Sequence, residues 1–160
     1  MNDHQSFYEP LDDNELRDHL RLSLPPTNSR LGWQLDEQQI LGAIDILGIE
    51  LPVRIRFMTT KHGDSLGTHY SRKDWHRVTI AQNIIKPGRA SEVLWHELVH
   101  CMQAERFAKR TGKSINQFHK EEYKMLDGDW GSSYQDNLLE IEANKIAYQK
   151  NINYRLCKEV

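Results

Sequence analysis

The sequence has only two cysteines in 160 residues, Cys101 and Cys157, so no disulfide framework is expected to hold the fold. No apolar run approaches the roughly 20 residues that a membrane-spanning helix needs. The first residues also lack the basic start and apolar stretch of a secretory signal. We therefore expect a protein of a reducing compartment, the cytoplasm, with no membrane segment.

The chain also lacks a charge bias, with 21 basic and 23 acidic residues and a net charge of -2. Such a balance predicts neither a broad basic surface for nucleic acid nor an acidic tail. One local basic run lies at residues 106–113. Its cations suit the C-terminal end of a helix, where they interact favourably with the helix dipole.

The length and a hydrophobic content of 38% suit one α+β domain that covers residues 1–160, with residues 1–10 as a loose lead-in. Apolar spacing and turn residues predict the elements in order. They are a short helix from Asp12 or Asp13 to about Leu22, a helix over 35–47 that ends at Gly48, and three short strands at 51–58, 68–71 and 76–81. A long helix follows from Ser91 to about Lys109, with Gly112 beyond its end, then a short helix near 116–125 and a final helix over 138–150.

The stretch LWHELVHCMQ, residues 94–103, contains the candidate metal ligands and the candidate general base. His96 and His100 are four residues apart, so a helix brings both imidazoles to one face, one turn apart. Glu97 lies about 100° around the helix, away from a metal held by the histidines but near a water bound to it. The pattern supplies two metal ligands and a general base.

His-Glu-x-x-His also occurs by chance, and the alternative is a metal-free core helix whose histidines form ordinary hydrogen bonds. A catalytic zinc site usually takes about three protein ligands and keeps one position open, so a third ligand should follow downstream. In a helical projection of the final helix, Glu140 falls on the apolar side, beside Ala143, whereas Glu142 falls on the polar side that should face solvent. A buried carboxylate needs a partner, which is either a metal or an arginine.

HELVH followed by EIEAN resembles the gluzincins, the thermolysin-like zinc peptidases, and the small predicted metallopeptidases of the ImmA/IrrE-like group. This resemblance covers about residues 77–147, and residues 1–50 match no family. It implies a minimal zincin-like domain, a three-stranded sheet packed on the motif helix and the final helix. Zn²⁺ would be bound by His96, His100 and Glu140, and Asn144 would support a ligating histidine.

A second resemblance is to the SprT-like peptidases, which use a third histidine as ligand. His119 is the one histidine downstream of the motif, although the neighbouring glycine usual in those proteins is missing. Under this alternative His119 would replace Glu140.

The zincin resemblance implies a peptidase in which Glu97 takes a proton from a metal-activated water and passes it to the leaving amine. Tyr134, Tyr123 and His119 are candidates to stabilise the oxyanion. The polypeptide substrate is expected to pair as an added strand with residues 77–81. The rival hypothesis is a zinc-containing regulatory or binding protein of the same fold that cuts nothing.

Overall fold

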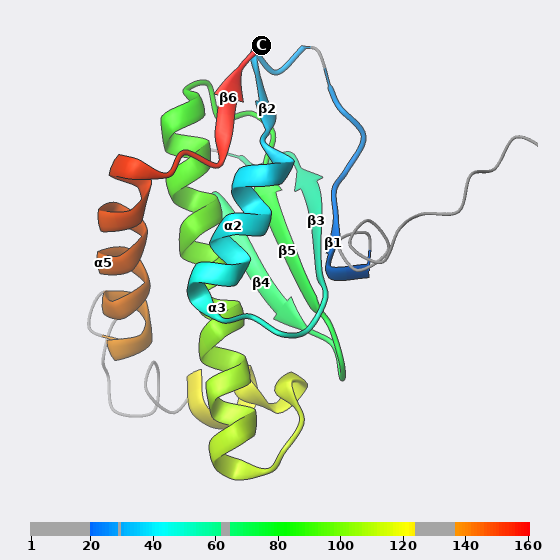
Figure 1. The fold of residues 1–160 in the computed structure, drawn as a ribbon, viewed down its shortest axis with the longest axis vertical. Coiled ribbons are helices and arrows are strands. Elements are labelled where there is room, and N and C mark those ends of the chain that lie inside the picture. Colours follow the sequence, from blue (N-terminus) through cyan, green and yellow to red (C-terminus); the bar gives the residue numbers. More distant parts are fainter. Residues whose placement is uncertain (1–19, 29, 62–64, 124–136) are drawn as a thin grey trace, which may run out of the picture.

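The computed structural model describes residues 20–28, 30–61, 65–123 and 137–160, which form a mixed α+β fold (Figure 1). This confirms the α+β class expected from the sequence. The predicted lead-in at residues 1–10 and the oxyanion candidate Tyr134 lie outside the described residues. In the part of the chain that is described, no helix combines the length and hydropathy that a membrane crossing requires.

The main sheet has four strands in the spatial order β1 (Leu22–Ser23), β3 (Val53–Met58), β5 (His76–Ala81) and β4 (Gly67–Ser71). The strands β1, β3 and β5 run parallel, and β4 is antiparallel to β5 at the edge. The three predicted strands are present as β3, β4 and β5. The expected three-stranded sheet is wrong, because the short strand β1 adds a fourth strand. Two residues are too few to show the alternation that identifies a strand.

The strand that was expected to bind a peptide is not at an edge. Residues 77–81 belong to β5, which pairs with β3 on one side and with β4 on the other. The expectation that a peptide pairs with residues 77–81 is therefore wrong. The order of strands along the chain does not determine their order in the sheet. Here β4, which precedes β5 in the sequence, lies at the edge of the sheet beyond it.

A second, two-stranded sheet joins distant parts of the chain. The strand β2 (Trp33–Leu35) pairs antiparallel with β6 (Cys157–Glu159). After β2, Asp36 caps helix α2 (Glu37–Leu47) by accepting a hydrogen bond from the Gln39 N–H, and Gly48 ends it in the left-handed conformation. The predicted helix over 35–47 is thus confirmed to within two residues.

The motif helix α3 (Pro87–Thr111) is longer than predicted and begins before Ser91. Pro87 occupies the first turn, where its missing N–H costs nothing. The Ser91 hydroxyl instead accepts a hydrogen bond from the Leu156 N–H at 2.7 Å and donates one to Asn151. Gly112 ends the helix with a φ of 75°, as its position in the sequence predicted.

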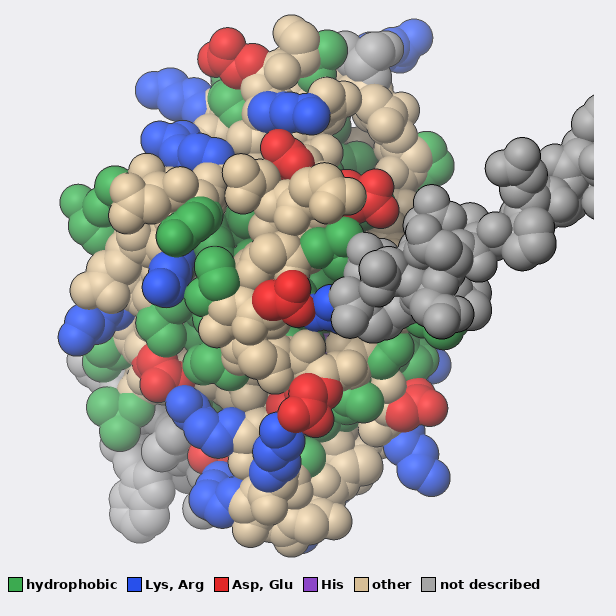
Figure 2. All heavy atoms as spheres, in the orientation of Figure 1, with side chains coloured by type: hydrophobic (Ala, Val, Ile, Leu, Met, Phe, Trp, Pro, Cys, Tyr) green, Lys and Arg blue, Asp and Glu red, His purple; other side chains and the backbone are tan. Residues whose placement is uncertain are grey.

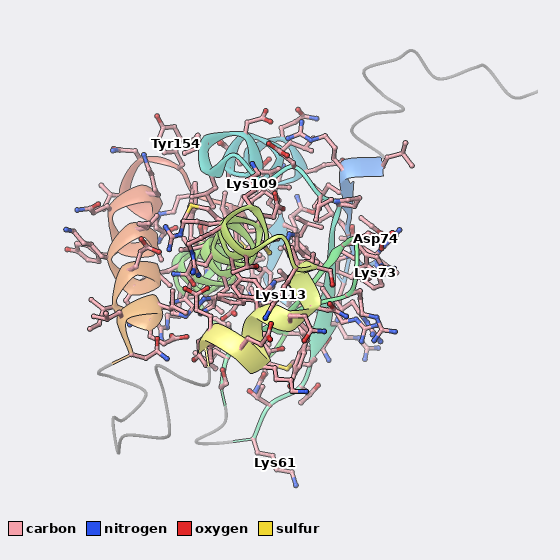
Figure 3. All side chains as sticks on the ribbon, turned by 90° about the horizontal axis from the view of Figure 1, so that it is seen from below. Lys61, Lys73, Asp74, Lys109, Lys113 and Tyr154 are labelled. Atoms are coloured by element: carbon pink, nitrogen blue, oxygen red, sulfur yellow. The ribbon has the colours of Figure 1, made fainter. Side chains whose placement is uncertain are left out.

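Two short helical turns, η2 (Ile115–Gln117) and η3 (His119–Tyr123), follow α3, and the final helix α5 spans Leu138–Asn153. Helix α3 lies between α5 and the sheet, as Figures 1 and 3 both show. Lys73 and Asp74, in the β4–β5 turn, project on the side away from α5 (Figure 3).

The space between α3 and the sheet is the main core, filled by Ile55, Val78, Ile80, Leu94 and Leu98 among others. Burial of apolar surface at about 25 cal/mol per Å² fixes α3 against the strands. Helix α3, packed in this way, carries His96, Glu97 and His100. On the face drawn in Figure 2, basic and acidic side chains are interspersed rather than gathered by sign.

Candidate metal centre

Three potential ligands converge from α3 and α5. The His96 and His100 Nε2 atoms are 3.1 Å apart. Glu140 Oε2 lies 2.9 Å from His96 Nε2, and Glu140 Oε1 lies 2.8 Å from His100 Nε2. The Glu140 side chain is only 3% exposed. The structure thus brings together the three side chains that the sequence pointed to, and among the described residues the buried carboxylate pairs with two imidazoles and with no arginine.

Local helix structure places Glu140. Asn137 is the N-cap of α5, and its side-chain oxygen accepts hydrogen bonds from the N–H groups of Leu139 and Glu140. The cap starts the helix so that Glu140 stands in the first turn and faces α3. The Asn137 amide also donates to the Tyr123 carbonyl at 3.3 Å, which ties η3 to the same point. Asn137 is fully buried, and its position directly before LLE was the signal that could have identified it.

Gln103 fixes the orientation of His100. Its amide nitrogen donates to the Leu139 carbonyl at 2.9 Å and to Glu142 Oε1 at 2.8 Å, so its oxygen is the acceptor for His100 Nδ1–H at 2.7 Å. Donation from Nδ1 leaves Nε2 free to act as a ligand. Gln103 was not predicted from the sequence, although it lies three residues after His100 on nearly the same helix face.

Tyr123 contacts the same centre from η3. Its hydroxyl donates a hydrogen bond to Glu140 Oε1 at 2.7 Å, and its ring stands edge-on to His100 with centroids 5.9 Å apart. Of the two tyrosines considered as oxyanion donors, Tyr123 lies beside Glu140 and His100, and Tyr134 is not among the described residues.

Glu97 is buried beside the three ligands, with 6% of its surface exposed. Burial raises the pKa of its carboxyl group, while the nearby His100 and His96 lower it in part. Edge strand β4 comes very close at this point: a Cβ added to Gly67 would lie 2.9 Å from Glu97 Oε2 and 2.8 Å from Val93 Cγ1. Glycine at position 67 therefore lets the backbone of β4 lie directly over the Glu97 carboxylate.

The electrostatics of His100 reflect the same convergence. Burial lowers its pKa, but the hydrogen bond with Glu140 and the charge of Glu97 outweigh burial, and the net pKa is raised. With Nδ1–H given to Gln103, the 2.8 Å contact to Glu140 Oε1 needs a second proton on Nε2. The raised pKa favours this second proton, which lies between His100 Nε2 and the Glu140 carboxylate.

Two hollows meet at this centre. One, of about 480 Å³, lies between Leu66 of the loop before β4, helix α3 and Asn144 of α5. The other, of about 190 Å³, continues past the opposite side of the centre to His119 and Tyr123. His96 and Glu97 line both. Together the hollows form a groove that follows the β4 edge and passes over the three converging side chains.

The remaining predicted site residues occupy other positions. Asn144 is exposed and lines the groove beside His96; among the described residues, Gln103 rather than Asn144 bonds His100. His119 Nε2–H donates to the His69 carbonyl at 2.7 Å, so the structure brings Glu140, not His119, to the two motif histidines. Tyr134 lies outside the described residues.

No protein-family model matches the chain, and neither a curated protein nor a solved structure shows a significant match.

Proposed function

We propose that the protein is a zinc-dependent peptidase with a minimal zincin-like fold. The observation that carries the proposal is the convergence of His96, His100 and Glu140 next to the buried Glu97. A site that serves structure alone needs no base beside it and normally closes with a fourth protein ligand.

The donor set fits a metal ion. Two imidazole nitrogens and a carboxylate oxygen lie within 4.8 Å of one another, and a His₂Glu set is one used by catalytic zinc. His96, His100 and Glu140 would hold the ion, which when bound would polarise a carbonyl group and lower the pKa of a water molecule. Gln103 supports this assignment, because it holds His100 in the tautomer that leaves Nε2 free to bind.

Glu97 is the proposed general base. Burial raises the pKa of its carboxyl group, which makes the carboxylate a stronger proton acceptor than an exposed one. Glu97 takes a proton from the attacking water and delivers it to the nitrogen of the leaving amine. Tyr123 and His119, which both line the smaller hollow, remain the candidates to donate to the substrate oxygen, and each would have to give up its present bond, to Glu140 or to the His69 carbonyl, or use another ring nitrogen.

The groove suits an extended polypeptide. The Ala81 N–H bonds the Leu66 carbonyl, and the Arg72 N–H bonds the Trp75 carbonyl, so residues 66 and 72 direct their backbone groups toward β5 and its turn. By the alternation of an antiparallel strand, Gly67 and His69 direct theirs outward. A peptide added to this free edge of β4 would lie in the groove over Glu97.

One observation favours the rival function, a zincin-like protein that binds without cutting. Ser65 Oγ–H donates to the Gly67 carbonyl at 2.6 Å, and His119 donates to the His69 carbonyl. Two outward acceptors of the free edge are thus already engaged. A substrate strand would have to replace these bonds or use only the N–H groups.

Incubation of the zinc-loaded protein with a denatured proteome digest, followed by mass spectrometry of new termini, tests the proposal. We expect cleavage by the wild type and none by Glu97→Gln, with both proteins holding equal zinc. Cleavage at equal rates by the two proteins would exclude Glu97 as the base. Absence of cleavage in the wild type, with zinc bound, would favour the binding protein.

A further inference from the structure

A second group of metal-binding side chains lies inside the core, on the part of α3 that faces the sheet. His69 of β4, His76 of β5 and Cys101 of α3 are 3%, 0% and 0% exposed. One potential ligand atom from each lies within 4.8 Å of the other two. Neither Cys101 nor the two histidines have a role in the function proposed above, and three such side chains rarely meet in an apolar core without a reason.

The donor atoms are spaced as ligands of one ion would be. His69 Nε2 and His76 Nδ1 are 3.2 Å apart, and Ser71 Oγ lies 3.0 Å from the first and 3.2 Å from the second. Two nitrogens bound to one tetrahedral zinc at about 2.0–2.1 Å would lie about 3.3 Å apart. The two motif histidines, His96 and His100, show the same spacing, 3.1 Å.

The surroundings of His76 are those of a histidine ligand. His76 Nε2–H donates to Glu105 Oε2 at 2.7 Å, which leaves the Nδ1 lone pair directed at His69. Glu105 is itself fixed, because it accepts hydrogen bonds from the backbone N–H groups of Glu50 and Leu51 at 2.8 and 3.2 Å. A carboxylate that holds the far nitrogen of a histidine sets its tautomer and strengthens it as a ligand.

We propose that His69, His76 and Cys101 bind a second metal ion, a thiophilic divalent cation such as zinc, with the Ser71 hydroxyl completing the site. His76 and Cys101 are fully buried, and His69, which also lines the smaller hollow, is only 3% exposed; such burial is typical of a structural site. Because its ligands come from β4, β5 and α3, the ion would hold the edge strand β4 onto the motif helix. This inference does not depend on peptidase activity or on the first centre.

The alternative is a metal-free network in which His69 Nε2–H donates to His76 Nδ1 or to Ser71. Such a network accounts for the two histidines and for Glu105, but gives the sulfur of Cys101 no part. Involvement of the sulfur therefore distinguishes the two explanations, and it has a spectroscopic signature.

Cobalt substitution of the whole protein provides the test. The metal is removed with a chelator, Co²⁺ is titrated in under reducing conditions, and the near-ultraviolet spectrum is recorded. We expect two equivalents of cobalt per chain and a sulfur-to-cobalt charge-transfer band that saturates with one of them. The first centre contains no sulfur and cannot produce this band.

Three variants assign the band. Cys101→Ser should lose the band and one equivalent of metal, whereas Cys157→Ser should keep both. Glu140→Gln should lose the other equivalent and retain the band, which separates the second site from the first. A wild-type protein that binds one equivalent with no charge-transfer band would overturn the proposal, and so would a band that survives in a folded Cys101→Ser variant.

Discussion

Gln103 accepts a hydrogen bond from His100 Nδ1 at 2.7 Å and anchors itself to the first turn of α5 through the Leu139 carbonyl. One amide thus connects the motif helix with the helix that carries Glu140. It fixes the ring of His100 and the distance between the two helices at the same point.

Replacement of this amide should weaken metal binding without removing a ligand. We predict that Gln103→Leu lowers zinc affinity about 10–100-fold, the usual effect of losing a partner of a ligating histidine. It should also lower the free energy of unfolding by about 1–3 kcal/mol, because buried polar partners are left unsatisfied. Competition with a chromophoric chelator measures the affinity. Gln149→Leu, an exposed glutamine of α5, is the matched control, and equal effects of the two would contradict this role.

In the metal-free protein, the buried Glu97 carboxylate should lower the free energy of unfolding. Burial raises its folded-state pKa above the unfolded value, so stability is lost as the pH rises from the unfolded toward the folded pKa. Glu97→Gln should therefore melt a few degrees higher than the wild type at pH 7, since about 1 kcal/mol corresponds to roughly 2–4 °C at this size.

The same difference should shrink at a pH below the unfolded pKa of glutamate, where the wild-type carboxyl is neutral in both states. Melting of the chelator-treated proteins between pH 4 and pH 7, roughly the range set by the ordinary pKa of glutamate, measures it. Glu92→Gln on the same helix is the control. A variant that melts no higher than the wild type at pH 7 would show that the Glu97 carboxylate is not a buried charge.

Zinc binding should release protons near neutral pH. The Glu140 hydrogen bond and the Glu97 charge outweigh the effect of burial and raise the pKa of His100, so its Nε2 carries a proton that the metal must displace. This raised pKa stabilises the metal-free fold at low pH, and that contribution is lost as the pH rises through the folded-state value. Calorimetry in two buffers of different ionisation enthalpy should give different apparent heats. Identical heats would show that no proton is displaced.

Gly67 should be intolerant of a side chain. In Gly67→Ala the added methyl group would meet Glu97 Oε2 and Val93 Cγ1 at less than 3.0 Å, so either β4 or the carboxylate must shift. We predict that zinc content is retained while peptide hydrolysis falls by about 10- to 100-fold, the cost of a misplacement of about 1 Å. Thr68→Ala, one residue further on, removes atoms without a clash and is the control. Full activity of Gly67→Ala would contradict close packing of β4 over Glu97.

The sequence identified the parts of the site that depend on helix periodicity. His96, Glu97 and His100 follow from one helix, and the inward face of Glu140 followed from the projection of another, because 3.6 residues per turn fixes which side chains share a face. The α+β class and the three main strands followed from alternation and turn residues in the same way.

Features that depend on how elements meet could not be predicted. Strand β4 pairs on the outer side of β5, so among the described strands β4 and not β5 forms that edge of the main sheet. The sequence does not specify this strand order. The contact of Gln103 with Leu139 joins residues 36 positions apart. His69, His76 and Cys101 meet because three elements pack together, and no spacing in the sequence indicates that meeting.

We propose that His96, His100 and Glu140 form one metal centre. Glu140 and Glu142 lie two residues apart on α5, but only Glu140 faces the histidines. Glu142 pairs with Arg106 and accepts a hydrogen bond from Gln103, which a glutamine at position 142 can also accept. The most direct test is zinc affinity of the wild type, Glu140→Gln and Glu142→Gln, each in the Cys101→Ser background so that a single site is titrated. We predict a loss of more than about 100-fold for Glu140→Gln, beyond the usual effect of a supporting residue, and little change for Glu142→Gln. Equal affinities of the two variants, or a parent that binds no zinc, would contradict the account.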